Sequence, residues 1–311
     1  MKDVKVVFMG TPEFCVPVLE YLINNCNVIG VVTQPDKEVG RKHILTYSPV
    51  KKKALEHNIK VIQPVKIRNE YEDIISLNPD IIVTCAYGQI VPSIILDAPR
   101  LGCINVHASL LPELRGGAPI HKAIIYGHKK TGITIMYMDK GMDTGDMISK
   151  VEVEISNLDT ATTLHDKLME ASVKLLEETL PSIVNGTNKR EKQDDSKATY
   201  AYNVSRDEEH INFNNNALDI YNQIRGLNSW PGAYSNLKDK QVKIWSSTIF
   251  EKKFNSEPGT IEDIDKNGML ISTKDKSILI TEIQMPGKKK TKVKDFINGI
   301  KKEDYIGKCF N

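Results

Sequence analysis

Residues 4–14 have the sequence VKVVFMGTPEF, a short apolar run followed by Gly, Thr, Pro and Glu. The run from 4 to 9 is rich in valine and has the length of a buried β-strand. Thr11 suits a helix N-cap, Pro12 the first helical position and Glu13 the first turn. The stretch therefore predicts a strand that turns directly into a helix, which is the repeating unit of an α/β domain.

The same pairing of a short apolar run with a helical pattern recurs through the first half of the chain. Further strands are expected at 28–33, 80–84, 103–106 and 133–136, with helices from about Val50, Glu70 and Pro119. Such near-continuous apolar runs are typical of strands buried on both faces of a parallel sheet. The alternation predicts an α/β fold with a doubly wound, Rossmann-like and mostly parallel sheet, whose sites lie beyond the carboxyl ends of the strands.

The first strand-to-helix turn argues against a dinucleotide ligand. It contains no G-x-G-x-x-G sequence, and Glu13 lies where a pyrophosphate would approach the helix N-terminus. The turn therefore disfavours nicotinamide and flavin dinucleotides.

The last third of the chain has a different pattern. A long helix is expected at 160–183 and another at 217–227, followed by short strand-like runs at 242–250, 259–264, 269–273 and 277–285. Asn267-Gly268 is a strong hairpin signal, and short strands at this spacing favour a small OB-like β-barrel. We therefore expect a catalytic domain at 1–186, a polar linker at 187–205 and an OB-like domain at 206–311.

The overall composition is that of an ordinary globular protein. Of 311 residues, 40% are hydrophobic and 26% are charged, and 42 Lys and Arg against 40 Asp and Glu give a net charge of +2. The five cysteines form no C-x-x-C pair, which favours reduced thiols in a cytoplasmic protein and disfavours a zinc site. No apolar stretch approaches the roughly 18 residues of a membrane helix.

The stretch from 102 to 120, GCINVHASLLPELRGGAPI, carries the strongest chemical signal. Asn105 and His107 are two residues apart on an expected strand, so their side chains leave the same face. The amide of Asn105 can stabilise a developing oxyanion, and the imidazole of His107 can move a proton, as acyl transfer requires. The alternative is that both side chains merely satisfy buried backbone groups at the end of a strand.

A second signal is MDKGMDTGDM at 138–147, in which Gly141 and Gly145 flank Asp143. The glycines are typical of a loop that holds a carboxylate with an unusual backbone, and Asp143 could orient His107 and relay its proton. A plain hairpin turn is an equally good interpretation of this loop alone. Its spacing does not match an EF-hand calcium loop.

These motifs, together with FMGTPEF at 8–14, TQPDKEVGR at 33–41 and AYGQI at 86–90, resemble the methionyl-tRNA formyltransferase family over nearly the whole chain. The resemblance implies transfer of a formyl group from 10-formyltetrahydrofolate to the α-amino group of methionyl-initiator tRNA, in the cytoplasm and with no metal. It implies Asn105, His107 and Asp143 as the catalytic residues. It also implies a folate site formed by Ser109, Leu110, Leu111, Pro112, Ala86, Tyr87, Gly88, Gln89 and Ile90.

Basic residues in two places are candidates for binding tRNA. The resemblance implies that Arg41 reaches the acceptor stem, and neighbouring Lys42 is a candidate phosphate contact. Seven lysines and one aspartate lie within 284–302, and Lys288, Lys289 and Lys290 on an OB-like barrel are expected to follow the tRNA backbone. For any one of these lysines, a solvated turn is the simpler interpretation.

Two other functions are open at this stage. The formyl-transfer motifs occur throughout the enzymes that use this donor, so a formyltransferase acting on a sugar nucleotide or another small amine is the first alternative. A nucleic-acid-binding module on an inactive α/β scaffold is the second. The intact set of Asn105, His107 and Asp143 disfavours the inactive scaffold. No obligate protein partner is expected.

Overall fold

The computed structural model describes residues 1–40 and 43–311. These residues form two compact units. Unit 1 comprises Met1–Pro119, Lys130–Glu154 and His165–Tyr202, and unit 2 comprises Ile120–Lys129, Ile155–Leu164 and Asn203–Asn311. Each unit has its own sheet and its own buried hydrophobic cluster.

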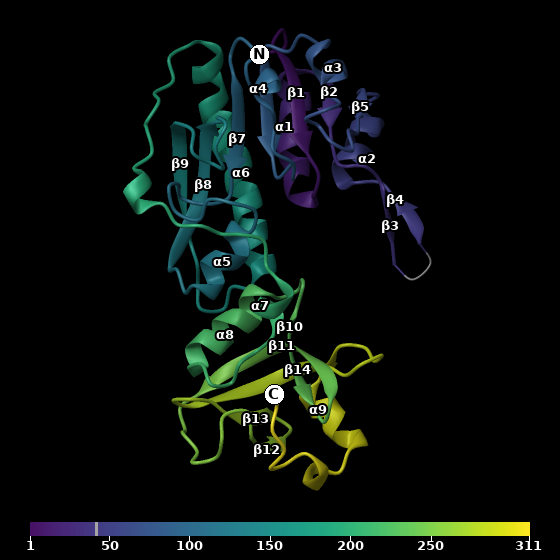
Figure 1. Cartoon of the computed structure of the whole chain (residues 1–311), viewed down its shortest axis with the longest axis vertical. Helices are drawn as coiled ribbons and strands as arrows, with labels where there is room; N and C mark the ends of the chain where they lie inside the picture. Colours follow the sequence, from purple (N-terminus) through teal and green to yellow (C-terminus); the bar gives the residue numbers. More distant parts are fainter. Residues whose placement is uncertain (41–42) are drawn as a thin grey trace. The chain divides into compact units, whose positions relative to one another are not determined.

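In the described part of unit 1, seven strands form one sheet in the order β5-β2-β1-β6-β7-β8-β9 (Figure 1). They are β1 Lys5–Gly10, β2 Asn27–Val32, β5 Val61–Ile62, β6 Ile81–Cys85, β7 Cys103–His107, β8 Lys130–Tyr137 and β9 Met147–Glu154. The first five strands of this order are parallel to one another. β8 is antiparallel to β7, and β9 is antiparallel to β8. The mostly parallel sheet predicted from the sequence is confirmed.

Most helices of this part of the chain connect strands of the sheet, and α6 and η2 follow its last strand in the chain, β9. The helices are η1 Glu13–Cys15, α1 Val16–Asn25, α2 Pro49–Glu56, α3 Glu72–Ile75, α4 Ser93–Leu96, α5 Pro119–Ile125, α6 Ala161–Val184 and η2 Asp195–Lys197. The expected N-cap at Thr11 is wrong, because residues 13–15 form a 3₁₀ turn whose N-cap is Pro12. The Thr11 hydroxyl instead donates to the carbonyl of Tyr87 at 3.1 Å and so joins the loops after β1 and β6.

The segment at 34–48 contains a short hairpin, β3 Lys37–Val39 with β4 Ile44–Thr46. Arg41 and Lys42, the tRNA contacts expected in this segment, lie outside the described residues. Near its base, the Asp36 carboxylate accepts hydrogen bonds from Lys51 Nζ at 2.5 Å and from Gln63 Nε2 at 2.9 Å. These contacts attach the start of the hairpin to α2 and to the residue that follows β5.

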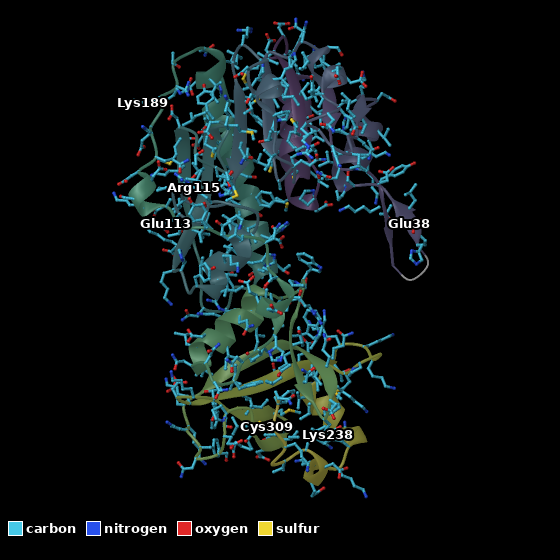
Figure 2. The ribbon with its side chains drawn as sticks, viewed as in Figure 1. Glu38, Glu113, Arg115, Lys189, Lys238 and Cys309 are labelled. Atoms are coloured by element: carbon cyan, nitrogen blue, oxygen red, sulfur yellow. The ribbon has the colours of Figure 1, made fainter. Side chains whose placement is uncertain are left out.

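The polar segment expected to be a linker has a defined course in unit 1. Residues 187–202 belong to unit 1, and their first part, which includes Lys189, runs along the outer side of β9 (Figures 1 and 2). Glu191 exchanges backbone hydrogen bonds of 2.8 Å with Met147 of β9. Further along, Arg115 pairs with Thr199 and Ala201 through backbone hydrogen bonds of 2.9 and 2.7 Å. The domain limits drawn from the sequence stay a prediction, but most of the expected linker packs against unit 1.

Unit 2 contains an antiparallel sheet and several short helices. In the described chain its strand order is β10-β11-β14-β13-β12, and β15 pairs with β14. The strands are β10 Ala233–Leu237, β11 Lys240–Phe250, β12 Ile261–Asp265, β13 Gly268–Ser272, β14 Ser277–Gln284 and β15 Thr291–Lys292. The helices are α7 Arg206–Glu209, α8 Ala217–Gly226, α9 Val293–Phe296, η3 Ile297–Gly299 and η4 Lys302–Asp304.

The hairpin predicted at Asn267-Gly268 joins β12 to β13, but the turn lies one residue earlier. Asp265 pairs with Gly268, so Lys266 and Asn267 are the turn residues. The Asp265 carboxylate fixes this turn by accepting the backbone N–H groups of Asn267 and Gly268 at 2.8 and 3.2 Å.

Residues 307–311 close the antiparallel sheet of unit 2. Asn311 exchanges backbone hydrogen bonds of 2.9 Å with Asn236 of β10. On the other side, the backbone N–H of Ile261 in β12 donates to Lys308, and that of Phe310 donates to Gly259. The two edge strands are therefore bridged by one segment, which agrees with the expected barrel. The Phe310 ring lies 5.6 Å from that of Phe213 inside the hydrophobic cluster of the unit.

No helix of the described residues is long and apolar enough to cross a membrane.

Phe310→Ala should destabilise unit 2, because this side chain is 3% exposed and lies on the closing segment. Replacing a buried Phe by Ala costs about 3–5 kcal/mol. Both tryptophans, Trp230 and Trp245, lie in unit 2, so their fluorescence during urea unfolding reports on this unit. Phe250→Ala is the control, since Phe250 is 41% exposed. Equal unfolding midpoints for the two variants would contradict the closing role of this segment.

Candidate active site

Asn105 and His107 occupy alternate positions of β7, a strand inside the sheet of unit 1. Asn105 lies opposite Thr84 of β6 and Met136 of β8, and His107 lies opposite Thr134 of β8. Because β7 is paired on both sides, its register is fixed and both side chains leave one face of the sheet, as expected.

The carboxamide of Asn105 is oriented by the neighbouring strand. The Thr84 hydroxyl lies 2.9 Å from Asn105 Oδ1 and can donate to it. The Asp143 carboxylate can only accept, so the amide nitrogen Nδ2 is the atom that faces it and Oδ1 is the atom that faces Thr84. Nδ2 lies 3.5 Å from Asp143 Oδ1. A primary amide has two N–H donors, so at least one remains for a group that enters the site.

The hydrogen bonds of His107 determine which ring nitrogen is free. Nε2 lies 3.1 Å from the carbonyl oxygen of Leu114. A carbonyl only accepts, so Nε2 carries the proton. Nδ1 is therefore the basic nitrogen of the neutral ring, and it lies 3.7 Å from Asp143 Oδ2. This distance is too long for a direct hydrogen bond, and a donor placed between the two atoms can bond to both.

Asp143 is held in an unusual backbone conformation. Its φ is +55°, in the left-handed region that most residues avoid and that Asp tolerates better than most. Its Oδ2 accepts the backbone N–H of Gly116 at 2.8 Å. A Cβ on the neighbouring Gly145 would lie 1.9 Å from the carbonyl oxygen of Tyr137, so the loop can take this path only with glycine there. The loop is also the connection between antiparallel β8 and β9, so the hairpin interpretation holds as well.

The structure thus brings Asn105, His107 and Asp143 together on one face of the sheet. His107 is 6% exposed, and the Asp143 side chain is 16% exposed. An amide donor, a basic nitrogen and a carboxylate converge within hydrogen-bonding range of one small group, which is the arrangement required to polarise a carbonyl and transfer a proton.

The residues after β6 that are expected to bind folate, Ala86 to Ile90, form an open loop. Ala86 and Gly88 have positive φ values of +45° and +90° and are exposed. A Cβ built on Gly88 would meet only Gln34 Nε2, at 3.6 Å. Ile90 is 88% exposed. Tyr87 and Gln89 hold the loop in place, since the Tyr87 carbonyl accepts from Gln34 Nε2 at 3.0 Å and Gln89 Oε1 accepts from the backbone of Ile67.

The segment from Ser109 to Pro112 is packed more tightly. The Ser109 hydroxyl is buried and donates to the carbonyl of Glu113 at 2.6 Å. Leu111 is 1% exposed, and its backbone N–H donates to the Thr134 hydroxyl. Leu110 and Pro112 are half-buried. Leu110 and Pro112 are therefore the side chains of this segment best placed to contact a ligand.

Three residues that shape the site were missed by sequence reasoning. Thr84 orients Asn105, Thr134 anchors the segment after β7, and Gln193 donates from Nε2 to the carbonyls of Asp143 and Gly145, both at 2.8 Å. Thr84 and Thr134 are polar residues inside apolar strands, a signal that could have identified them. Gln193 lies in the supposed linker and carries no comparable signal.

Cys103, the cysteine on the same strand as Asn105 and His107, is not activated as a nucleophile. All five cysteines, which lie in the described part of the chain, are free thiols. Cys103 is on β7 two residues before Asn105, and burial raises its pKa to about 12. A thiol with this pKa stays protonated near pH 7 and is a poor nucleophile. Residues 1–40 and 43–311 contain no group of three or more His, Cys, Asp or Glu able to hold a metal ion.

Two of the three lysines of unit 2 that are expected to bind tRNA border a cavity of about 720 Å³. Lys288 and Lys289 line it together with Lys240, Met285 and Phe296. Among the described residues neither of these two lysines forms an ion pair. Lys290 is more restrained, because its Nζ lies 2.8 Å from Glu282 Oε2 and 5.3 Å from the centre of the Trp245 ring.

Formyl transferase sequences match the chain in both of its halves. A family model described as formyl transferase matches residues 4–180, and one described as formyl transferase, C-terminal domain, matches residues 203–301. The methionyl-tRNA formyltransferase of Bacillus subtilis (strain 168) is 53% identical over 299 residues, which are 95% of this chain and 94% of that protein. The chain belongs to the methionyl-tRNA formyltransferase family.

Two solved structures share the fold of this family member. The N-formyltransferase from Helicobacter canadensis, in complex with folinic acid and dTDP-3-aminofucose, aligns with a TM-score of 0.68 and 23% identity over 89% of this chain and 99% of its own. The methionyl-tRNA formyltransferase from Clostridium thermocellum aligns with a TM-score of 0.56 and 19% identity over 79% of this chain and 94% of its own. The family resemblance carried by the sequence motifs is confirmed.

Proposed function

We propose that the chain transfers the formyl group of 10-formyltetrahydrofolate to the α-amino group of methionyl-initiator tRNA, giving the N-formylmethionyl-tRNA used in translation initiation. One observation carries this proposal: Asn105, His107 and Asp143 converge on one face of β7 in a chain 53% identical to a methionyl-tRNA formyltransferase.

The reaction suits a site without a covalent nucleophile. The attacking group is an α-amine, and a free α-amino group has a pKa of roughly 7.7–8.0. A useful fraction of such amines is already neutral near pH 7. The new bond joins this nitrogen to the formyl carbon, and the bond from that carbon to N10 of the folate breaks. The protein must position the two substrates, stabilise the carbonyl oxygen and move one proton.

Asn105 is suited to stabilise the carbonyl oxygen of the formyl group as negative charge develops on it. Its Oδ1 is engaged by Thr84, so its orientation is set before substrate arrives, and Nδ2 carries the available donors. A donor that is fixed in advance stabilises the developing negative charge without reorganising during the reaction.

His107 and Asp143 are suited to carry the proton. Nδ1 of His107 and Oδ2 of Asp143 are 3.7 Å apart, and a protonated amine or a water between them can donate to either. The Leu114 carbonyl holds the His107 tautomer, and Gly116 holds the carboxylate. The proton lost by the amine is then delivered to N10 of the leaving folate, so the enzyme is unchanged after each cycle.

The loop from Ala86 to Ile90 is suited to border the folate. Open space around Gly88 and the exposed side chain of Ile90 leave room for a flat ring system. Leu110 and Pro112 add apolar surface from the segment after β7. Tyr87 is oriented inward, with its ring in the hydrophobic cluster of unit 1, and contributes through its backbone.

A sugar nucleotide is the weaker candidate for the acceptor. The N-formyltransferase from Helicobacter canadensis, solved in complex with dTDP-3-aminofucose, shares the fold at 23% identity, whereas the identity to the Bacillus subtilis methionyl-tRNA formyltransferase is 53%. Contact with the acceptor stem through Arg41 and Lys42, the lack of an obligate protein partner and a cytoplasmic location stay predictions.

The acceptor is tested by offering 10-formyltetrahydrofolate together with methionyl-initiator tRNA, free methionine or a nucleotide-linked amino sugar in parallel. We expect formyl transfer to the tRNA with a kcat/KM at least about 10³-fold above that for either small amine. The measurement is radiolabelled formyl incorporation. Preferred transfer to the amino sugar would contradict the proposed acceptor.

Asn105→Ala should lower kcat by on the order of 10²–10³, the usual effect of losing one oxyanion donor. The reason is that this amide is the fixed donor closest to the proposed reaction centre. The kinetics are followed with saturating methionyl-tRNA, and circular dichroism checks the fold. Asn188→Ala is the matched control, because Asn188 is a half-buried amide of unit 1 that bonds to Tyr137. A folded Asn105→Ala enzyme of nearly normal rate would exclude the proposed role.

Replacing Lys288, Lys289 and Lys290 together by Gln should weaken tRNA binding and flatten its salt dependence. The slope of log K against log [salt] falls by about 0.9 for every lysine that no longer neutralises a phosphate. Lys290 should contribute least, because Glu282 already neutralises part of its charge. The slope is measured by filter binding at several KCl concentrations between roughly 50 and 200 mM. Lys252, Lys253 and Lys266, replaced together, are the charge-matched control. An unchanged slope would remove this cluster from the interface.

A further inference from the structure

We infer that Gln193 is a positioning residue for formyl transfer, acting through the backbone of Asp143. The inference rests on the proposed function, because it assigns a structural support to a carboxylate that the proposal places in the reaction.

The backbone strain at Asp143 is the first observation. A non-glycine residue at a φ of +55° needs surrounding contacts that favour this conformation. Gln193 supplies two of them, since its Nε2 donates to the carbonyl oxygens of Asp143 and Gly145, each at 2.8 Å. One side-chain amide therefore ties together the two ends of the sharp turn that carries the carboxylate.

Gln193 is itself held by a buried arginine. Its Oε1 accepts from Arg115 Nε at 3.1 Å and from Arg115 Nη2 at 2.8 Å. Arg115 and Gln193 are 2% and 5% exposed, and Arg115 lies inside unit 1 near Glu113 (Figure 2). Because an arginine can only donate, it assigns Oε1 as the acceptor and Nε2 as the donor, so the orientation of the amide is fixed.

The arginine also connects the two supports of the carboxylate. Arg115 directly precedes Gly116, whose N–H donates to Asp143 Oδ2 at 2.8 Å. Its second partner is Asp195, with Oδ1 2.7 Å from Arg115 Nη2. Backbone hydrogen bonds to Thr199 and Ala201 fix Arg115 further. The side chain and the main chain of Asp143 are thus held from one rigid segment, 115–116, with Gln193 as the intermediate for the main chain.

This arrangement gives the segment at 187–202 a role in the reaction. Gln193 does not approach Asn105 or His107 in any described contact, so its influence passes through the position of Asp143. A displacement of about 1 Å in a reacting group can cost on the order of 10²-fold in rate. Losing the two donated hydrogen bonds should therefore lower kcat and leave substrate affinity nearly unchanged.

Gln193→Glu is the most informative variant. An ionised Glu keeps an acceptor for Arg115 but cannot donate, and it brings negative charge toward two carbonyl oxygens. We expect kcat to fall by about 10- to 100-fold, with KM for both substrates within about threefold of the original values. Gln193→Met, which has similar size and no donor, should show the same kcat loss and serves if the Glu variant does not fold. Asn188→Asp is the matched control, an amide-to-carboxylate change in the same segment.

A double-mutant cycle with Asp143→Asn separates positioning from a general structural role. Asn tolerates positive φ, so this change removes the charge and keeps the turn. If Gln193 acts through the Asp143 carboxylate, adding Gln193→Glu to Asp143→Asn should change kcat by less than about twofold, because the group it positions is already gone. If Gln193 only maintains the amount of folded enzyme, the two losses should multiply.

The outcomes distinguish this inference from the proposed function. Multiplying losses, or a normal kcat in folded Gln193→Glu and Gln193→Met enzymes, would overturn the role of Gln193 while Asp143→Asn still lowered the rate. A normal rate in the Asp143→Asn enzyme would instead overturn the proposed role of Asp143. A kcat loss in the Gln193 variants that disappears in the Asp143→Asn background supports the inference.

Discussion

The candidate site depends on one carboxylate that three distant segments hold in place. Asp143 lies in the connection between β8 and β9, Gly116 comes from the segment after β7, and Gln193 comes from the segment after α6. Without the hydrogen bonds from Gly116 and Gln193, a residue at positive φ would relax toward ordinary backbone, and the carboxylate would leave the vicinity of His107. Fixing this group costs part of the folding free energy, and it sets in advance the geometry that the proposed reaction requires.

Much of the fold could be predicted because its strands are buried on both faces. The runs that became β1, β2, β6 and β7 are mostly apolar, with few polar interruptions, and this pattern is distinctive. β9 was missed for the opposite reason. Its sequence MISKVEVE alternates between half-buried and exposed residues, as an edge strand with one wet face does, and Lys150 and Glu152 interrupt the apolar signal. The course of 187–202 was missed because its packing uses backbone and polar side chains, which a hydrophobic pattern cannot report.

The site was predictable where chemistry and local spacing coincide, and not where long-range contacts decide. Asn105 and His107 share a face because they are two residues apart on a strand, and this spacing can be seen in the sequence itself. That Asp143 approaches them follows from the path of a loop 36 residues later than His107 in the chain. The local sequence left a plain hairpin turn as an equal interpretation of this loop, and the family resemblance decided between the two. Gln193 had no indication at all, because its function depends on a buried arginine 78 residues away.

The proposed catalytic groups and the proposed tRNA-binding lysines differ in their electrostatic environment. The proposed catalytic groups are mostly buried and oriented by hydrogen bonds to fixed partners, so their interactions with a substrate depend on short distances and precise orientation. Lys288 and Lys289 are exposed, and their proposed contact with tRNA would depend on screened charge, which attracts a polyanion without distinguishing its sequence. Formyl chemistry and tRNA capture should therefore vary independently. Fold alone does not select the acceptor, and the same fold occurs in a methionyl-tRNA formyltransferase and in an N-formyltransferase solved in complex with dTDP-3-aminofucose.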